Sequence, residues 1–269
     1  MFTGLTVALV TGVPRGTYIG QTFGWQATFL IVALLGLIAL IGSAILVPSN
    51  LKQPPAAKIS AQLKVLTQPR LLLVYAITAL GYGGTFTAFT FLAPILENVS
   101  GFDSSSISLI MLVYGVSVAV GNIWGGKMAD KMSPIKALTV ISSGLATVLV
   151  VFNFTAVNPY AAVATILVWG ALAFGNVQGL QVYVVKLAEK YTPDAVDVAS
   201  GLNIAAFNVG IALGSWDGGL IVAKSGLMTP PWVGAVTVLF ALVLTRFSGV
   251  LDNRGKKQAP LFKISSCSH

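Results

Sequence analysis

The sequence has very little histidine, cysteine or charge. Of 269 residues one is histidine and one is cysteine, and only 16 are basic and eight acidic. His269 is the last residue, so histidine-based Ser or Cys catalysis and His-ligated metal sites have no candidate inside the fold. Cys267 has no second cysteine to pair with, and no P-loop or dinucleotide-binding glycine pattern is present. We therefore expect no enzyme, no metal and no cofactor.

Charged residues are too few for a protein whose main solvent is water. Hydrophobic residues make up 55% of the chain and charged residues 9%, far from the balance of a soluble domain. The net charge is +8, but the cations are scattered between apolar runs and form no stripe with interleaved aromatics. We expect the lipid bilayer as a partner, and no nucleic acid. The apolar start, residues 1–13, follows no basic segment, so a cleaved signal peptide is not expected.

Long apolar runs are what the sequence does contain. A hydrocarbon core about 30 Å thick needs roughly 20 apolar residues per helix. Eight runs meet or nearly meet this length, at about 1–22, 27–47, 71–96, 107–126, 137–156, 160–185, 198–223 and 230–249. Short turn signals rich in Pro, Gly, Ser and Asn separate them. The sequence thus predicts an all-α membrane protein with about eight transmembrane helices.

The distribution of Lys and Arg predicts the orientation in the membrane. Successive connections between spans lie on alternating sides of the membrane. The connections on one side, with the C-terminal tail, hold 14 of the 16 basic residues, and those on the other side hold only Arg15 and Lys224. Cytoplasmic loops carry an excess of Lys and Arg. We therefore expect the loop 48–70, the turn 127–136 and the C-terminus in the cytoplasm, with the N-terminus on the same side.

An internal repeat predicts how the spans are grouped. At an offset of 202 residues, Gly12-Val13-Pro14-Arg15-Gly16 aligns with Gly214-Ser215-Trp216-Asp217-Gly218, so the first span resembles the seventh. The repeat unit is then six spans, as in transporters built from two parallel six-span halves. Four spans of the first half are missing on this interpretation. The expected units are two last helices of a first half (1–47), a loop between halves (48–70), a six-helix second half (71–251) and a basic tail (252–269).

Two segments carry the strongest local patterns. Glycines at 12, 16, 20 and 24 fall on one stripe of the first span around Pro14, which lets a neighbouring helix approach closely. Ordinary helix packing explains such a stripe as well. The turn Gly126-Lys127-Met128-Ala129-Asp130-Lys131 places one carboxylate between cations, where Asp130 can accept bonds from free helix N–H groups while the lysines face anionic headgroups. A solvated turn that follows the positive-inside rule is the alternative.

These segments resemble conserved motifs of the major facilitator superfamily. The stripe around Pro14 is similar to the fifth-helix motif of its antiporters, and the turn 126–131 to its Gly-x-x-x-Asp-Arg/Lys loop between helices eight and nine. With Gly24-Trp25-Gln26 and Phe207-Asn208-Val209-Gly210, they resemble the bacterial arabinose-efflux or drug:proton antiporter branch. The resemblance covers nearly the whole chain to about Leu251. It implies helices 5 to 12 of a twelve-helix fold in a bacterial inner membrane, and secondary active export coupled to proton entry.

Only two charged residues lie inside the expected spans away from their cytoplasmic ends. Arg15 and Asp217 are both near the expected outer helix ends, and the repeat makes them equivalent. One hypothesis is that Asp217 titrates in a proton relay or external gate with Arg15 as a counter-ion. The other is that each side chain extends to the outer interface, which costs little near a helix end. Gly12, Pro14, Arg15 and Gly16, with Gly126, Lys127, Asp130 and Lys131, are the candidate gating residues.

Neutral polar and aromatic residues are the candidates for a solute pocket. They lie on spans with glycines or at polar positions within apolar runs: Tyr75, Tyr82, Tyr114, Gln178, Gln181, Asn203 and Asn208, with Asp217 as the candidate for coupling. Amides and phenols with few charges suit a neutral, hydroxyl-bearing or amphipathic solute such as a sugar or a drug. Hydrogen bonding between helices explains each of these residues as well.

Three functional hypotheses follow. The first is proton-coupled efflux of a small solute. The second is that the chain does not transport by itself and is a remnant or a partner subunit, with the missing N-terminal helices supplied by another chain. The third is import of sugars or nucleosides, because the residues fix no direction.

Overall fold

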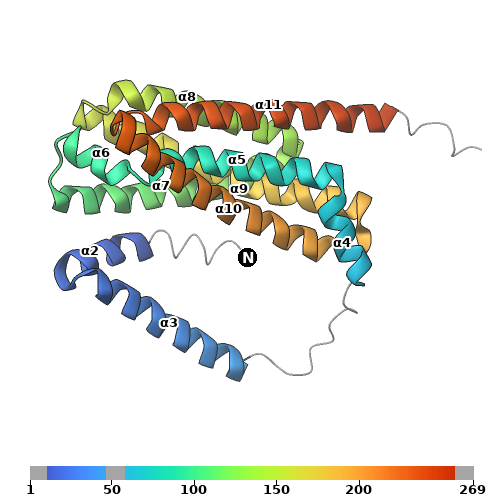
Figure 1. The fold of residues 1–269 in the computed structure, drawn as a ribbon, viewed down its shortest axis with the longest axis horizontal. Coiled ribbons are helices and arrows are strands. Elements are labelled where there is room, and N and C mark those ends of the chain that lie inside the picture. Colours follow the sequence, from blue (N-terminus) through green and yellow to red (C-terminus); the bar gives the residue numbers. More distant parts are fainter. Residues whose placement is uncertain (1–10, 47–57, 258–269) are drawn as a thin grey trace, which may run out of the picture.

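The structure of the chain, a computed structural model, describes residues 11–46 and 58–257. These residues form helices and no strand (Figure 1). The helices are α2 (Val13–Phe23), α3 (Trp25–Leu46), α4 (Ile59–Thr67), α5 (Pro69–Phe89), α6 (Leu92–Asn98), α7 (Ser104–Lys131), α8 (Pro134–Thr155), α9 (Pro159–Tyr191), α10 (Val196–Ser225) and α11 (Pro230–Lys257), with a 3₁₀ turn, η2 (Pro193–Ala195).

Seven of these segments are long and apolar enough to cross a membrane. They correspond to the seven runs expected from residue 27 onward, which confirms the all-α membrane fold. The run expected at 1–22 lies partly outside the described residues, and its described part is the 11-residue helix α2. Helix α4 lies within the expected loop 48–70, and α11 continues past the expected end of the second half at 251.

Proline and side-chain caps explain where the helices begin. Prolines occupy the first helical turn of α5, α8 and α9, where the missing N–H is not needed. The Asp103 carboxylate accepts bonds from the N–H groups of Ser105 and Ser106 and begins α7. Hydrogen bonds from the Ser105 side chain, and then from Ser106, hold the pKa of Asp103 well below its usual range. Asn158 caps α9 in the same way.

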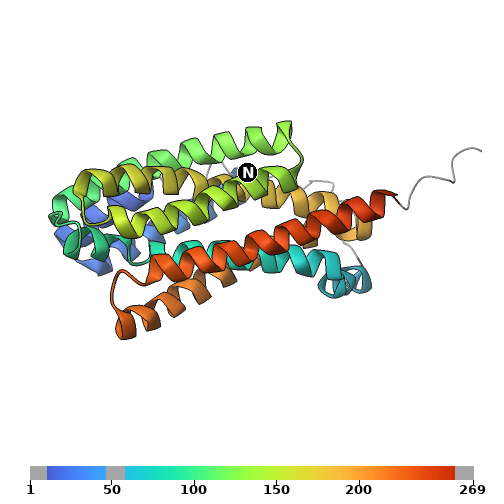
Figure 2. The same ribbon diagram turned by 90° about the horizontal axis from the view of Figure 1, so that it is seen from above.

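One body is formed by the packed helices α5, α7, α8, α9, α10 and α11. A hairpin of α2 and α3 lies beside it (Figure 1). Helix α5 packs mainly against α10 and α11, helix α9 mainly against α7 and α8, and α8 against α11. The main contacts stay the same when α5 is exchanged with α9, α7 with α10 and α8 with α11. The helix packing of the body therefore has an approximate internal two-fold symmetry. Figure 2 shows α7 and α10 on opposite sides of it. The hairpin contacts the body through α2 and α7, and no residue of α3 is buried.

Glycines allow the backbones of these helices to touch. A Cβ on Gly121 or Gly125 of α7 would collide with the backbone of Ala171 or Gly175 in α9. On α5, a Cβ on Gly84 would lie 2.6 Å from the carbonyl oxygen of Gly234 in α11. Contacts this close replace the hydrophobic driving force that is absent between helices in lipid.

A charged cluster joins three helices at the end of the body that carries α4. The Arg70 guanidinium of α5 forms an ion pair with Asp252 of α11 and donates to the Ser248 carbonyl oxygen at 3.2 Å. The Tyr183 hydroxyl of α9 donates to the second Asp252 oxygen at 2.8 Å. Arg70 and Asp252 were expected in the loop and the tail, whereas the structure makes them part of the bundle.

A pair of substitutions on α5 tests the glycine contacts. Gly84→Ala should lower the free energy of unfolding by about 1–3 kcal/mol, because the added methyl overpacks a backbone contact. Gly81→Ala is the matched control, since nothing lies within 4 Å of its Cβ position; it should be neutral or stabilising by roughly 0.5–1 kcal/mol. Thermal unfolding of both variants in detergent measures the difference, and equal melting temperatures would contradict the close approach.

Candidate functional site

A chain of neutral side chains connects α5, α9 and α10. The Thr78 hydroxyl donates to Asn203 Oδ1 at 2.8 Å, and Asn203 Nδ2 donates to Gln181 Oε1 at 2.9 Å. Gln181 Nε2 in turn donates to the Ser200 hydroxyl. Thr78 and Asn203 are fully buried. We call Thr78, Gln181, Ser200 and Asn203 the polar network; its amide groups bond to one another, which lowers the cost of burying them in an apolar bundle.

Aromatic rings form a second group, farther from the end that carries α4. The Tyr82 ring meets Phe207 edge-on with 4.4 Å between centroids, and it stacks on Phe86 at 6.2 Å. Contacts continue from Phe86 to Phe89 at 5.3 Å and from Phe89 to Tyr114 at 5.2 Å. Offset and edge-on pairs of this kind stabilise by about 0.5–1.5 kcal/mol beyond their buried area.

The aromatic group borders a cavity of about 110 Å³. Its walls come from α5, α7 and α9, and we call it the aromatic cavity; it is lined by Phe86, Phe89, Met111, Tyr114, Gly115, Val118 and Phe174. None of these side chains is charged. The volume is below the roughly 300–1,000 Å³ of small-molecule pockets, so the cavity accommodates one ring or apolar group of a solute rather than a whole large one.

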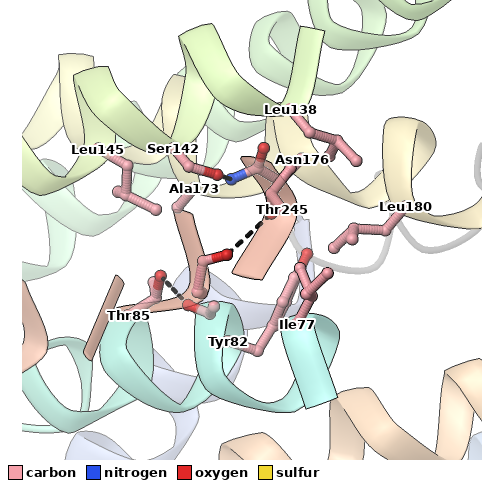
Figure 3. Close-up of a pocket in the computed structure, with 12 residues that line it drawn as sticks. Ile77, Tyr82, Thr85, Leu138, Ser142, Leu145, Ala173, Asn176, Leu180 and Thr245 are labelled. Carbon is pink, nitrogen blue, oxygen red and sulfur yellow. Dashed lines mark hydrogen bonds between the residues drawn. The ribbon is translucent and has the colours of Figure 1, made fainter. Parts of the chain in front are cut away.

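A smaller cavity of about 10 Å³ lies between α5, α8, α9 and α11. Figure 3 shows Tyr82 and Thr85 of α5 on one side of it and Ser142 and Asn176 on the other. Asn176 Nδ2 donates to the Ser142 hydroxyl at 3.4 Å. We call this space the polar cavity; Tyr82 separates it from the aromatic cavity, since its ring contacts the wall residues Phe86 and Phe174.

The structure brings together five of the eight candidate solute or coupling residues. Gln181 and Asn203 belong to the polar network, and the Tyr75 hydroxyl donates to the Ala199 carbonyl oxygen beside it at 3.2 Å. Tyr82 and Tyr114 are buried in the aromatic group. All five also make contacts between helices, so the alternative interpretation, a role in helix packing, applies to them as well.

The other three candidates lie elsewhere. Gln178 is half-buried beside Gly126, at the crossing of α7 and α9. Asn208 is exposed and donates to the Ile204 carbonyl oxygen of its own helix at 2.9 Å. Asp217 is exposed near the far end of α10, next to exposed Trp216. In the described residues the one ion pair joins Arg70 and Asp252, so Asp217 and Arg15 are not counter-ions here.

The candidate gating residues sit at two helix ends. In α2, Gly12 precedes the first turn with Pro14, Arg15 is exposed, and the carbonyl oxygen of Gly16 accepts a bond from Thr28 of α3 at 3.2 Å. The side chain of Pro14 lies outside the described part of the structure. The stripe glycines Gly16 and Gly20 therefore face Thr28 within the hairpin.

The turn from Gly126 to Lys131 forms the last part of α7. Lys127, Asp130 and Lys131 are all exposed. Helix α8 begins after Ser133 without a side-chain cap, so Asp130 does not satisfy its N–H groups as the sequence suggested. The reason is geometric, because α7 remains helical through Lys131 and keeps Asp130 on the helix surface.

Several residues of the site were not found from the sequence. Phe86 and Phe174 were read as ordinary apolar residues of long spans, and Phe207 was noted only within the segment 207–210. The cross-helix contacts of all three carry no local signal. Thr78 and Ser200 were missed because Thr and Ser commonly bond the carbonyl of their own helix. Asn176 was missed as well, although an amide within an apolar run beside Gly175 is a signal that could have identified it.

Residues 1–192 match the family model described as Major Facilitator Superfamily. The MFS-type transporter YtbD of Bacillus subtilis (strain 168) is 51% identical over 96% of this chain and 65% of its own length. The inner membrane transport protein YdhP of Escherichia coli (strain K12) is 32% identical over 92% of this chain and 62% of YdhP. A probable sugar efflux transporter of Pasteurella multocida (strain Pm70) is 31% identical over 90% of this chain and 58% of that protein.

The chain thus spans less than two thirds of the length of each of these relatives. Among solved structures, the MFS transporter FucP in its outward conformation superposes with a TM-score of 0.61 at 12% identity. The match covers 91% of this chain and 73% of the FucP chain. At this level of identity, the likeness concerns the fold alone.

Substitutions of two asparagines on α10 test the polar network. Asn203→Ala should lower the free energy of unfolding by about 1–3 kcal/mol, because it leaves the fully buried Thr78 hydroxyl and the half-buried Gln181 Oε1 without their partner. Asn208→Ala removes only an exposed bond within α10 and should change the stability by less than about 0.5 kcal/mol. Thermal unfolding in detergent gives both values, and an Asn203→Ala variant as stable as Asn208→Ala would show that the network contributes nothing.

Proposed function

The chain belongs to the Major Facilitator Superfamily, and on this premise we propose that it is part of a secondary active transporter whose solute contacts the aromatic cavity. The observation that carries the proposal is the uncharged cavity walled by α5, α7 and α9, together with the polar network, which shares α5 and α9 with it and adds α10. Cavities between the helices of a bundle are common ligand sites. An apolar group of the solute would occupy the cavity, and amides and hydroxyls would orient its polar part.

The proposed solute is small and neutral or amphipathic, such as a sugar or a lipophilic drug. Phenyl and phenol rings bind the apolar face of a sugar or a drug ring, and neither lining nor network offers a charged partner. The printed name of the P. multocida relative, a probable sugar efflux transporter, supports export and a sugar. Proton coupling rests on the resemblance of the segment Gly12–Gly16 to the antiporter motif.

We also propose that the transporting unit contains further helices that cover the exposed face of α3. All residues of α3 remain unburied, and α2 is its main contact in the chain. Alternating access needs two halves that move against each other, and the described residues contain only one six-helix body. The segments Gly12–Gly16 and Gly126–Lys131 are the proposed moving contacts of such a unit, in an inner membrane with Lys-rich turns facing the cytoplasm.

Everted membrane vesicles test both proposals. Cells express the chain alone, or together with the part of YtbD that has no counterpart in it, and the vesicles receive a pH gradient. Uptake of a neutral glycoside, isopropyl thiogalactoside, and of an amphipathic dye, ethidium, is then measured. We expect gradient-driven uptake of one probe in the co-expressing vesicles. Uptake by the chain alone would refute the need for further helices, and no uptake in either case would count against transport of these solute classes.

A conservative change in the aromatic cavity should alter solute affinity. Phe89→Leu removes the ring contacts with Phe86 and Tyr114, so KM for the transported probe should rise roughly twofold to twelvefold, the equivalent of about 0.5–1.5 kcal/mol. The maximal rate should change little. Phe154→Leu is the matched control, because Phe154 is 68% exposed on the surface of α8. If both variants keep the original KM, the cavity does not bind the solute.

Substitution of Asp217 separates the two hypotheses for this carboxylate. Its exposure next to Trp216 supports a place at the membrane interface, so Asp217→Asn should leave gradient-driven uptake within about twofold of the original rate. Asp197→Asn, at the opposite end of α10, is the control for loss of one surface charge. A selective loss of gradient-driven uptake in Asp217→Asn would instead assign Asp217 to the proton pathway.

A further inference from the structure

The polar cavity contains two buried polar atoms without a hydrogen-bond partner. The Tyr82 hydroxyl and Asn176 Oδ1 both lack a partner among the described residues, although both side chains are only 6% exposed. Both residues line the polar cavity. One is an O–H donor and the other is an acceptor. Leaving both unsatisfied in an apolar bundle is unfavourable, and native proteins rarely do so.

The size of the polar cavity fits one small ligand. Its volume of about 10 Å³ is close to the roughly 10–15 Å³ that a single water molecule requires. A sugar, a drug or a hydrated ion is far too large. A bare metal cation is unsuited as well, because no carboxylate lines the cavity and the Tyr82 O–H needs an acceptor.

From these observations we infer that the polar cavity binds one ordered water molecule, which accepts a hydrogen bond from Tyr82 and donates one to Asn176. Further acceptors are present, since Thr85 and Thr245 use their hydroxyl hydrogens for the carbonyl oxygens of Gly81 and Ala241 and keep free lone pairs. Buried waters typically make two to four hydrogen bonds. The water therefore adds a hydrogen-bonded link between Tyr82 of α5 and Asn176 of α9.

The water also holds a wall of the aromatic cavity in position. Tyr82 carries the hydroxyl at one end, and its ring stacks on Phe86 and meets Phe174 edge-on. Phe86 and Phe174 line the aromatic cavity. Tyr82 is thus a positioning residue between the two cavities. The inference about the water rests on the polar cavity alone and stands whether or not a solute binds next to it.

The sign of one stability change tests the inference. In a hydrated cavity, Tyr82→Phe removes a hydrogen bond and should lower the melting temperature by about 2–4 °C. In a dry cavity, the same change removes an unpaired hydroxyl and should raise it. Asn176→Leu should also lower the melting temperature. The double variant should lower it by less than the sum of the two single shifts, because both residues bond the same water. A rise for Tyr82→Phe, or shifts that simply add, would overturn the inference.

Tyr114→Phe is the matched control. The Tyr114 hydroxyl is also buried without a partner, but it borders the apolar lining of the aromatic cavity rather than the polar cavity. Its removal should leave the melting temperature unchanged or raise it. A fall equal to that of Tyr82→Phe would mean that the loss of any tyrosine hydroxyl destabilises this bundle, and would refute a specific water site.

A second measurement needs no variant. X-ray radiolysis of the purified chain generates hydroxyl radicals from bound water, so Tyr82 should be oxidised faster than fully buried Trp169, which does not line the polar cavity. Tyr183, whose hydroxyl is paired with Ser248 and Asp252, controls for the reactivity of a buried tyrosine. Mass spectrometry of the peptides quantifies the three rates. A Tyr82 rate no higher than those of Trp169 and Tyr183 would rule out the water.

Discussion

Direct contact between helix backbones is the interaction on which the rest of the structure depends. Lipid is as apolar as the side chains that face it, so burial alone gives two helices no reason to associate. In this chain, glycines bring α7 against α9 and α5 against α10 and α11 until carbonyl oxygens touch the facing backbone. Such short separations allow uncharged side chains like Thr78 and Asn203 to bridge helices with single hydrogen bonds. The polar network therefore exists because the backbones are close.

The internal symmetry of the body explains why the site lies on α5 and α9. Each of these two helices packs against two others, and exchanging the two triplets of helices exchanges their partners. Tyr82-Gly83-Gly84 on α5 and Phe174-Gly175-Asn176 on α9 hold similar positions, each with an aromatic ring followed by a glycine that touches a neighbouring backbone. The two rings meet at 6.3 Å. The same local arrangement, present on both helices, thus places two aromatic rings in contact. The aromatic cavity and the polar cavity lie on different sides of this pair.

Much of the fold could be predicted from the sequence, because it depends on quantities that are summed over a helix. Hydrophobicity over 20 residues located the spans, and prolines located several beginnings. The break between α5 and α6 was not predicted, since Thr90 and Phe91 carry no breaking signal of their own. The candidate site was only partly predicted. Tyr82, Gln181 and Asn203 stood out as polar groups within apolar runs, whereas Phe174 and Phe207 matter through contacts between distant helices that no local pattern encodes. Arg70 and Asp252 were missed for the same reason, as they are 182 positions apart.

The cluster of Arg70, Tyr183 and Asp252 has a mechanical consequence. Helix α4 leads directly into α5, and Arg70 follows in the first turn of α5, where Asp252 of α11 holds it. A pull transmitted along α4 therefore acts on three helices at once rather than peeling α5 from its end. The ends of α5, α9 and α11 would then move together under such a load, because the same carboxylate holds Arg70 and Tyr183.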